Sequence, residues 1–166
     1  MLVQIAQRIS IDPMYMDKDI ENHILNKLKT STENTCTYTH GYINKIIRLV
    51  KIIDNLVGTP GSSIFFNIIY EAETIRPVNG LVLNGTVCMI FEQGIFVDIL
   101  NKIKIIIPIS FLTDFKYIPS YEKSGPVFVH EKLVITSGIN INIEIVRTKY
   151  EEKQFSCIGK INLNNF

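Results

Sequence analysis

The sequence predicts an α+β protein in two parts: a strand–helix–strand module over residues 1–77, followed by a five-stranded β-barrel over residues 78–166. In the first half, strand-like alternation of apolar and polar residues surrounds one stretch with helical spacing. The second half has no convincing helical stripe and instead holds short strand-like segments separated by turn residues.

Strand-like alternation opens the chain. Apolar residues alternate with mostly polar neighbours at Val3, Ile5, Ile9 and Ile11. Asp12-Pro13 should end this strand, because proline has no N–H to donate to a ladder. From about Asp17 to Lys29 the spacing becomes helical, with an apolar stripe made of Ile20, Ile24, Leu25 and Leu28.

The rest of the first half predicts two more strands and a loop. One strand is expected from Thr35 to Ile53, with a bend or bulge at Gly41. Residues 54–63, rich in Gly, Pro, Asn and Ser, predict a loop. A second strand should run from Ile64 to Ile75 and end at Arg76-Pro77, with one side made of Phe66, Ile68, Tyr70 and Ala72.

The second half predicts a Greek-key barrel. Strands are expected at about 80–91, 94–100, 103–109, 138–147 and 154–161, and a long surface loop at 113–126. Gly85-Thr86-Val87 and then Gly94-Ile95-Phe96-Val97 form a hairpin whose second strand begins with an aromatic on one face. This hairpin is typical of oligonucleotide-binding barrels (the OB fold), which bind single-stranded nucleic acid on their second and third strands.

Composition narrows the function classes. No apolar run approaches the roughly 18 residues of a membrane span, and residues 1–11 lack a signal-peptide pattern. The three cysteines, Cys36, Cys88 and Cys157, predict free thiols in a reducing intracellular compartment. The net charge is only +1, and it is not segregated between the halves, so binding to nucleic acid should be weak.

Catalysis has little support. His23, His40 and His130 are scattered over different elements, and the four-residue spacing of Cys36 and His40 gives no assured contact on a strand. The sequence shows no phosphate-binding glycine motif and no metal cluster, so we expect no cofactor, no metal and no catalytic residue.

Phe96 is the candidate for stacking on a base. Four cations could contact phosphates beside it: Lys102, Lys104, Arg147 and Lys149. The competing interpretation is an ordinary barrel aromatic, with lysines and arginine that solvate a strand edge.

Several segments in order resemble the larger stalk subunit of multisubunit RNA polymerases of the eukaryotic RNA polymerase II and archaeal type. The similar segments are residues 33–43, the Gly/Pro/Ser loop 58–63, Phe65 to Pro77, Gly94-Ile95-Phe96-Val97, Ile118-Pro119-Ser120-Tyr121 and Ile158-Gly159-Lys160-Ile161. The resemblance covers nearly the whole chain, which is more specific than a single barrel hairpin.

This resemblance implies a non-catalytic subunit that aids initiation. Its tip domain (1–77) would dock on the polymerase core near the clamp and RNA exit, and its barrel would contact nascent RNA. The docking residues implied are Pro13, Met14, Tyr15, Gly58, Thr59, Pro60, Gly61 and Ser62. A smaller stalk subunit is a further implied partner, and no membrane partner is expected. The location would be the nucleus for a cellular protein, and the virion or a cytoplasmic viral factory for a viral one.

Two residues depart from the RNA-binding members of this barrel class. Gln93 stands where a second aromatic is expected, and Pro108 where a histidine is expected. We therefore keep two alternatives open. One is a free-standing RNA-binding barrel protein of translation or RNA decay, and the other is a hydrolase on a barrel scaffold that uses His40 or Glu71.

Overall fold

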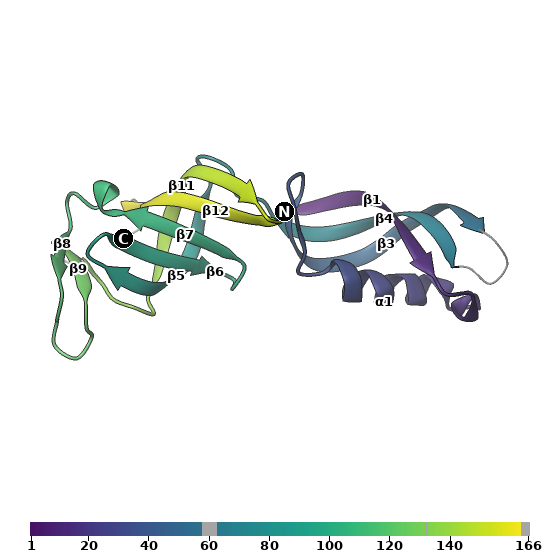
Figure 1. The fold of residues 1–166 in the computed structure, drawn as a ribbon, viewed down its shortest axis with the longest axis horizontal. Coiled ribbons are helices and arrows are strands. Elements are labelled where there is room, and N and C mark those ends of the chain that lie inside the picture. Colours follow the sequence, from purple (N-terminus) through teal and green to yellow (C-terminus); the bar gives the residue numbers. More distant parts are fainter. Residues whose placement is uncertain (58–62, 132, 164–166) are drawn as a thin grey trace. The chain divides into compact units, whose positions relative to one another are not determined.

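The computed structural model describes residues 1–57, 63–131 and 133–163. The chain divides into an N-terminal unit, Met1–Arg76, and a C-terminal unit, Pro77–Phe166. The N-terminal unit contains β1 (Leu2–Ile11), the 3-10 helix η1 (Pro13–Tyr15), α1 (Ile20–Thr32), β2 (Cys36–Thr37), β3 (Gly41–Val57) and β4 (Ile64–Ile75) (Figure 1).

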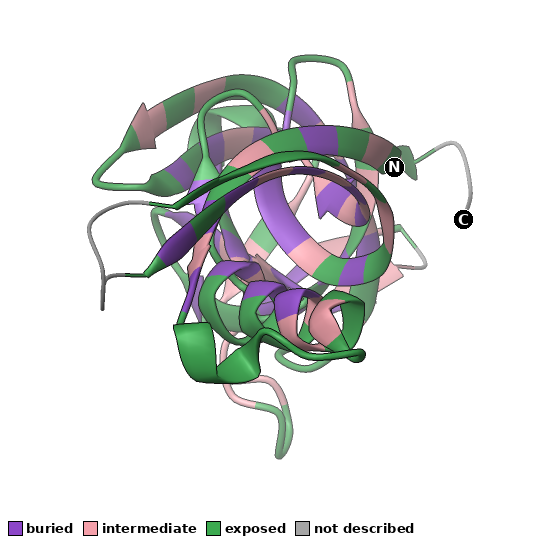
Figure 2. Ribbon diagram, turned by 90° about the vertical axis from the view of Figure 1, so that its right-hand side faces the viewer, coloured by how far each residue is buried: buried purple, intermediate pink, exposed green. Residues whose placement is uncertain are grey.

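The N-terminal sheet is antiparallel, has the order β1-β4-β3-β2, and is covered on one face by α1. Strand β4 is central, and its buried residues alternate along the strand. Figure 2 shows bands of buried and exposed residues along the ribbons. The sheet and α1 enclose one core made of Ile5, Ile9, Ile11, Ile24, Leu28, Ile43, Ile46, Ile64, Phe66, Ile68, Tyr70 and Ala72. The strands predicted at the start of the chain and at Ile64–Ile75 are therefore confirmed.

Strand β3 differs from the prediction in length and period. It has 17 residues and pairs with the 12 residues of β4 through four register shifts, between Ile43/Lys45, Ile46/Arg48, Leu49/Lys51 and Ile52/Asp54. At each shift β3 has one extra residue that has no partner on β4. As a result, every third residue of β3 lies on the side of α1, instead of every second. These residues are Ile43, Ile46, Leu49 and Ile52, all of which pack in or against the core.

Three boundaries in this unit were predicted wrongly. The helix begins at Ile20, because the Asp17 carboxylate accepts the N–H of Asp19 (2.8 Å) in a turn that precedes it. The strand predicted at Thr35–Ile53 is two strands, β2 and β3, since Gly41 has φ +75° at the end of the turn that connects them. Residues 54–57 of the predicted loop belong to β3 and pair with β4.

The C-terminal unit holds a closed barrel with the order β11-β12-β7-β6-β5. Its strands are β5 (Val82–Phe91), β6 (Gly94–Ile99), β7 (Ile103–Pro108), β11 (Asn140–Glu151) and β12 (Gln154–Ile161), so the predicted five-stranded barrel is confirmed. Strands β12 and β7 pair in parallel, and the other neighbours are antiparallel. Ile95, Val97, Ile105 and Ile143 are among the residues buried inside.

The segment predicted as a loop at 113–126 contains a strand. Strand β8 (Lys116–Ile118) pairs with β9 (Val127–His130), and β9 pairs with β10 (Leu133–Ile135). This small sheet follows the second 3-10 helix, η2 (Ile109–Phe111). Its Phe128 is fully buried and contacts the ring of Tyr117, with ring centroids 5.3 Å apart. Within the described ranges, no helix is long and apolar enough to cross a membrane.

We expect the change Gly41→Ala to destabilise the N-terminal unit. An added Cβ would lie 2.3 Å from the carbonyl oxygen of Ile75, at a φ of +75° that already disfavours a side chain. Overpacking and backbone strain together should lower the free energy of unfolding by about 2 kcal/mol or more. Urea denaturation measures this change.

Gly80→Ala is the matched control. Gly80 has φ +87°, but nothing lies within 4 Å of a Cβ added there, so only the backbone strain remains. Its effect should be about 1 kcal/mol. Equal losses for the two variants would contradict the close approach at Gly41.

Candidate nucleic-acid interface and docking end

The outer face of the barrel brings Phe96 into line with residues of the neighbouring strands. Ile95 and Val97 are buried inside, so the alternation of β6 turns Phe96 outward. The register then places five outward residues in one row across the five strands: Met89, Phe96, Ile106, Ile158 and Arg147.

A second row lies next to the first. It contains Asp98, Lys104, Ser156 and Lys149 as successive cross-strand partners. Lys104, Arg147 and Lys149 are all exposed. The register therefore places Lys104 on the strand next to Phe96, whereas Arg147 and Lys149 lie on β11, three strands along these rows from Phe96. Lys102 instead lies in the turn between β6 and β7, where its N–H donates to the carbonyl of Ile99 (3.0 Å).

Acidic residues offset the positive charge of this face. Lys149 Nζ lies 3.1 Å from a carboxylate oxygen of Glu151, and Lys160 Nζ lies 3.6 Å from Glu144. Asp98 is the direct partner of Lys104 across β6 and β7. Exposed pairs of this kind stabilise the fold little, but they lower the field that a phosphate would meet. The face should therefore rely on apolar and stacking contacts more than on charge.

Phe91 supplies a second aromatic that the sequence analysis missed. Its ring meets the Phe96 ring edge to face, with centroids 5.7 Å apart and an interplanar angle of 89°. Phe91 is 43% exposed, and it lies opposite Gly94, which has no side chain to separate it from Phe96. The phenylalanine two residues before Gln93 was a signal, but only the cross-strand register showed its contact.

Large apolar residues are also exposed around these two rings. Met89 and Ile106 flank Phe96 on the neighbouring strands, and Ile109 and Phe111 follow β7. The outer face of β5, β6 and β7 is thus mainly apolar with polar margins, a composition that marks binding surfaces.

The end of the N-terminal sheet next to η1 holds the described part of the predicted docking site. Ile11 at the end of β1, Ile64 at the start of β4 and Val57 at the end of β3 are direct partners, so η1 and the two strand ends next to residues 58–62 lie together (Figure 1). Asp12 caps η1 by accepting the N–H of Met14 (3.1 Å). Gly58, Thr59, Pro60, Gly61 and Ser62 lie outside the described residues.

This end exposes several large apolar side chains. Met14 is 74% exposed, and no residue of η1 is buried. We call the exposed set the apolar end; it consists of Met14, Tyr15, Met16, Leu56, Val57 and Phe65. Such a patch on a small unit predicts contact with another protein.

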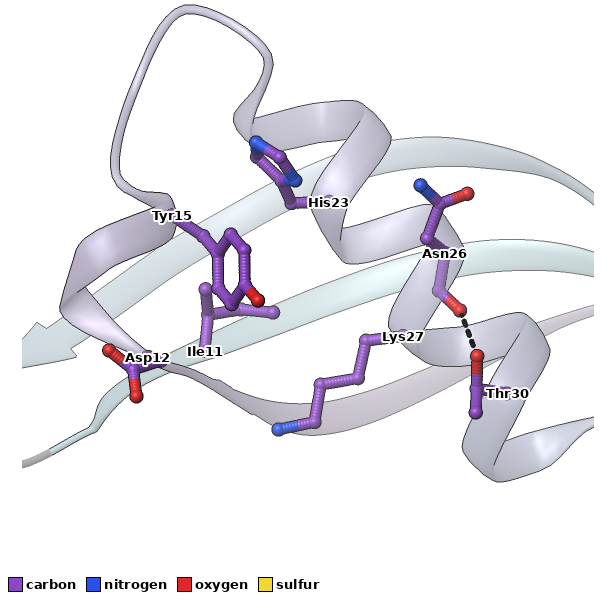
Figure 3. A pocket seen from close by; sticks show the side chains of 7 residues that line it. All are labelled: Ile11, Asp12, Tyr15, His23, Asn26, Lys27 and Thr30. Atoms are coloured by element: carbon purple, nitrogen blue, oxygen red, sulfur yellow. Dashed lines mark hydrogen bonds between the residues drawn. The ribbon is translucent and has the colours of Figure 1, made fainter.

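A pocket of about 450 Å³ opens beside the apolar end, between η1 and α1 (Figure 3). It is lined by Ile11, Asp12, Tyr15, His23, Asn26, Lys27 and Thr30. The His23 ring packs against Tyr15 (5.0 Å between centroids) and its Nε2 lies 3.2 Å from Asp17. The backbone N–H of Asp19, with a smaller contribution from His23, lowers the pKa of Asp17. These contacts fix η1 against the helix.

Two of the residues considered for catalysis, Cys36 and Glu71, lie in settings that do not favour it. Burial raises the pKa of Cys36 to about 11, so its thiol is a poor nucleophile. Glu71 lies 3.4 Å from the guanidinium of Arg48 on the open face of the sheet. In the part of the chain that the structure describes, no three His, Cys, Asp or Glu residues are grouped as metal ligands.

Comparison with known proteins agrees with this geometry. Residues 76–155 match the S1 RNA binding domain family. Over 159 residues the chain is 20% identical to "DNA-directed RNA polymerase II subunit RPB7" of Glycine max, covering 96% of this chain and 90% of the relative. Over 161 residues it is 26% identical to subunit rpb7 of Schizosaccharomyces pombe, covering 95% and 92%. Subunit 7 of Arabidopsis thaliana is 18% identical over 159 residues, covering 96% and 90%.

A thiol reagent at pH 8 should react quickly with one cysteine and slowly with two. Cys88 is exposed, whereas Cys36 and Cys157 are buried, and burial raises the pKa of both to about 11. About one in a thousand of each buried thiol is then ionised at pH 8. Cys88→Ser should remove the fast phase of an absorbance titration, and urea should make the remaining thiols react. A fast phase that survives in Cys88→Ser would contradict this assignment.

Proposed function

We propose, from its homology to subunit 7 of RNA polymerase II along about 95% of its length, that this chain is a non-catalytic stalk subunit of a multisubunit DNA-directed RNA polymerase. The relatives have nearly the same length and carry polymerase names, which supports this function over a free-standing RNA-binding protein of translation or RNA decay. The single observation that carries the proposal is this match along almost the whole chain. It includes both the part that matches the S1 domain and the N-terminal unit with its exposed apolar end.

The two units would do different work. The apolar end would dock on the polymerase core, through Pro13, Met14 and Tyr15 together with residues 58–62. The outer face of the barrel would offer nascent RNA a stacking surface made of Phe91 and Phe96, with Lys104, Arg147 and Lys149 near its phosphates. Because acidic residues offset these cations, RNA binding would be weak and would gain from delivery of the strand by the polymerase.

The remaining features of the proposal follow from the same assignment. The subunit would act by binding and positioning, and the chemistry would belong to the catalytic subunits. Its partners would be core subunits and a smaller stalk subunit. A cellular protein of this kind would work in the nucleus, and a viral one in the virion or a cytoplasmic viral factory.

Phe96→Ala should weaken binding of a single-stranded RNA oligonucleotide about tenfold, because one stacked base contributes roughly 1–3 kcal/mol. Phe91→Ala should act in the same direction, since the two rings are in contact. Fluorescence anisotropy with a labelled oligonucleotide at low salt measures the affinity.

Phe65→Ala is the control for this experiment, because it removes a comparable exposed ring from the apolar end of the other unit. We expect its RNA affinity to equal that of the unsubstituted chain. A similar loss in Phe65→Ala, or none in Phe96→Ala, would remove the stacking role of the barrel.

Met14→Asp should prevent co-purification with the polymerase and leave RNA affinity unchanged. Met14 is 74% exposed, so a carboxylate there costs the fold little but would have to be desolvated in a docked interface. Affinity purification of the tagged full chain, with the polymerase subunits quantified by mass spectrometry, measures the outcome. Phe96→Ala is the reciprocal control and should co-purify normally. Full co-purification of Met14→Asp would argue against docking through η1.

A further inference from the structure

The two sides of the N-terminal sheet differ in the backbone N–H and C=O groups that they present to a further strand. In the order β1-β4-β3-β2, β1 pairs only with β4, so its other side has no strand beside it among the described residues of the N-terminal unit (Figure 1). Its pairing with β4 is unbroken from Leu2↔Glu73 to Ile11↔Ile64. A straight, regular edge of this kind is a template for another strand.

The hydrogen bonds at the start of β1 show which backbone groups point outward. The N of Met1 donates to the carbonyl of Thr74 (2.9 Å), and the N–H of Thr74 donates to the carbonyl of Met1 (2.8 Å). In an antiparallel ladder, bonded residues alternate with residues that face away from that partner. Val3, Ile5, Gln7 and Ile9 therefore bond to β4, and the N–H and C=O groups of Leu2, Gln4, Ala6 and Arg8 point outward.

Near the C-terminal end of β1, the outward carbonyl of Ser10 already accepts a hydrogen bond. The ammonium of Lys27 on α1 donates to the carbonyl of Ser10 and to its hydroxyl (3.2 Å for the hydroxyl). This contact takes an outward carbonyl that a new strand would need. The edge that can accept a strand is thus limited to residues 2–8.

The opposite side of the sheet lacks such an edge. Strand β3 carries four bulges, which interrupt the spacing of its outward groups. The N–H of Ile46 is taken by the Glu33 carboxylate (2.8 Å), and the start of β3 is covered by β2. Bulges and side-chain caps are devices that protect an edge from pairing. Residues 2–8 of β1 have none of them.

We propose that β1 accepts, as an additional strand, an extended segment of another subunit of the polymerase assembly. The side chains beside the edge define that segment. Ala6 is small and exposed, so it leaves room for a β-branched or aromatic residue opposite. The Arg8 guanidinium is held on the open face by Asn67 Oδ1 (3.2 Å), which favours an acidic residue opposite it.

A second copy of this chain is a poorer occupant. Residues 2–8 make a strip roughly 24 Å long and 5 Å wide, and two such strips bury far less than the roughly 1,000 Å² of a stable interface. A segment of the same assembly needs no such area, because docking elsewhere already raises its effective concentration. This inference therefore rests on the proposed function.

Hydrogen exchange with residue resolution tests the proposal on the full chain, free and in the purified polymerase. In the free chain the amides of Gln4, Ala6 and Arg8 should exchange quickly, and those of Val3, Ile5 and Gln7 slowly. In the complex we expect the first set to exchange at least about tenfold more slowly, with the second set as an internal reference.

Ala6→Pro and Ala6→Thr form the matched pair of variants. Proline removes the outward N–H and is tolerated on an edge where that group faces solvent, whereas threonine keeps it. Ala6→Pro should lose the protection of Gln4 and Arg8 in the complex, and Ala6→Thr should keep it. Circular dichroism of each free variant shows whether the fold is intact. If Ala6→Pro does not fold, the amide protection in the unsubstituted complex decides alone.

Two results separate the failure of this inference from failure of the proposed function. If the unsubstituted chain enters the polymerase but Gln4, Ala6 and Arg8 exchange as in the free chain, the added strand is wrong and the function stands. If the chain never enters a polymerase, both fall. Protection that rises with concentration in the free chain would identify a second copy as the occupant and overturn the proposal.

Discussion

Alternate side chains of β4 pack against α1, and the other elements of the N-terminal unit are arranged around this contact. Ile68, Tyr70 and Ala72 are fully buried, and β4 pairs along its length with β1 on one side and β3 on the other. Because the core takes one face of the sheet, the opposite face is open to solvent. It carries the Arg48–Glu71 ion pair and the hydrogen bonds of Asn67 to Arg8 and Asp54. Several of the exposed apolar residues of this unit gather where the sheet ends, beside η1.

The barrel buries its apolar side chains by closing on itself instead of packing one face of a sheet against a helix. Its interior is filled mainly by isoleucine and valine, and it has room for no side chain at Gly159, where an added Cβ would lie 2.5 Å from Ile143 Cγ2. Closure leaves the outward residues as the place where sequence can vary without loss of fold. Phe91, Phe96, Met89 and Ile106 occupy that outer face and give it an apolar surface.

Much of this architecture follows from periodicity alone. β1, β4, β6, β7 and β12 alternate along their length, and β5 and β11 alternate on either side of one register shift each, because each strand has one buried and one exposed face. The extent of β3 was harder to predict, because its bulges replace a period of two with a period of three. Its last residues, Asp54–Val57, have the composition of a loop. β8 has only three residues, too few for a pattern. Phe91 was missed for a different reason: its contact with Phe96 depends on register across two strands, which no local pattern contains.

The bulged strand also sets how this sheet can change in length over evolution. Along β3, three residues advance the ladder by two residues of β4, as the pairs Ile43↔Thr74, Ile46↔Ala72 and Leu49↔Tyr70 show. An insertion of one or two residues in β3 would rotate every later side chain off the core. An insertion of three in β3, matched by two in β4, would lengthen the sheet and keep each face intact. Related chains whose N-terminal sheets differ in length should therefore differ by three residues in β3 for every two in β4.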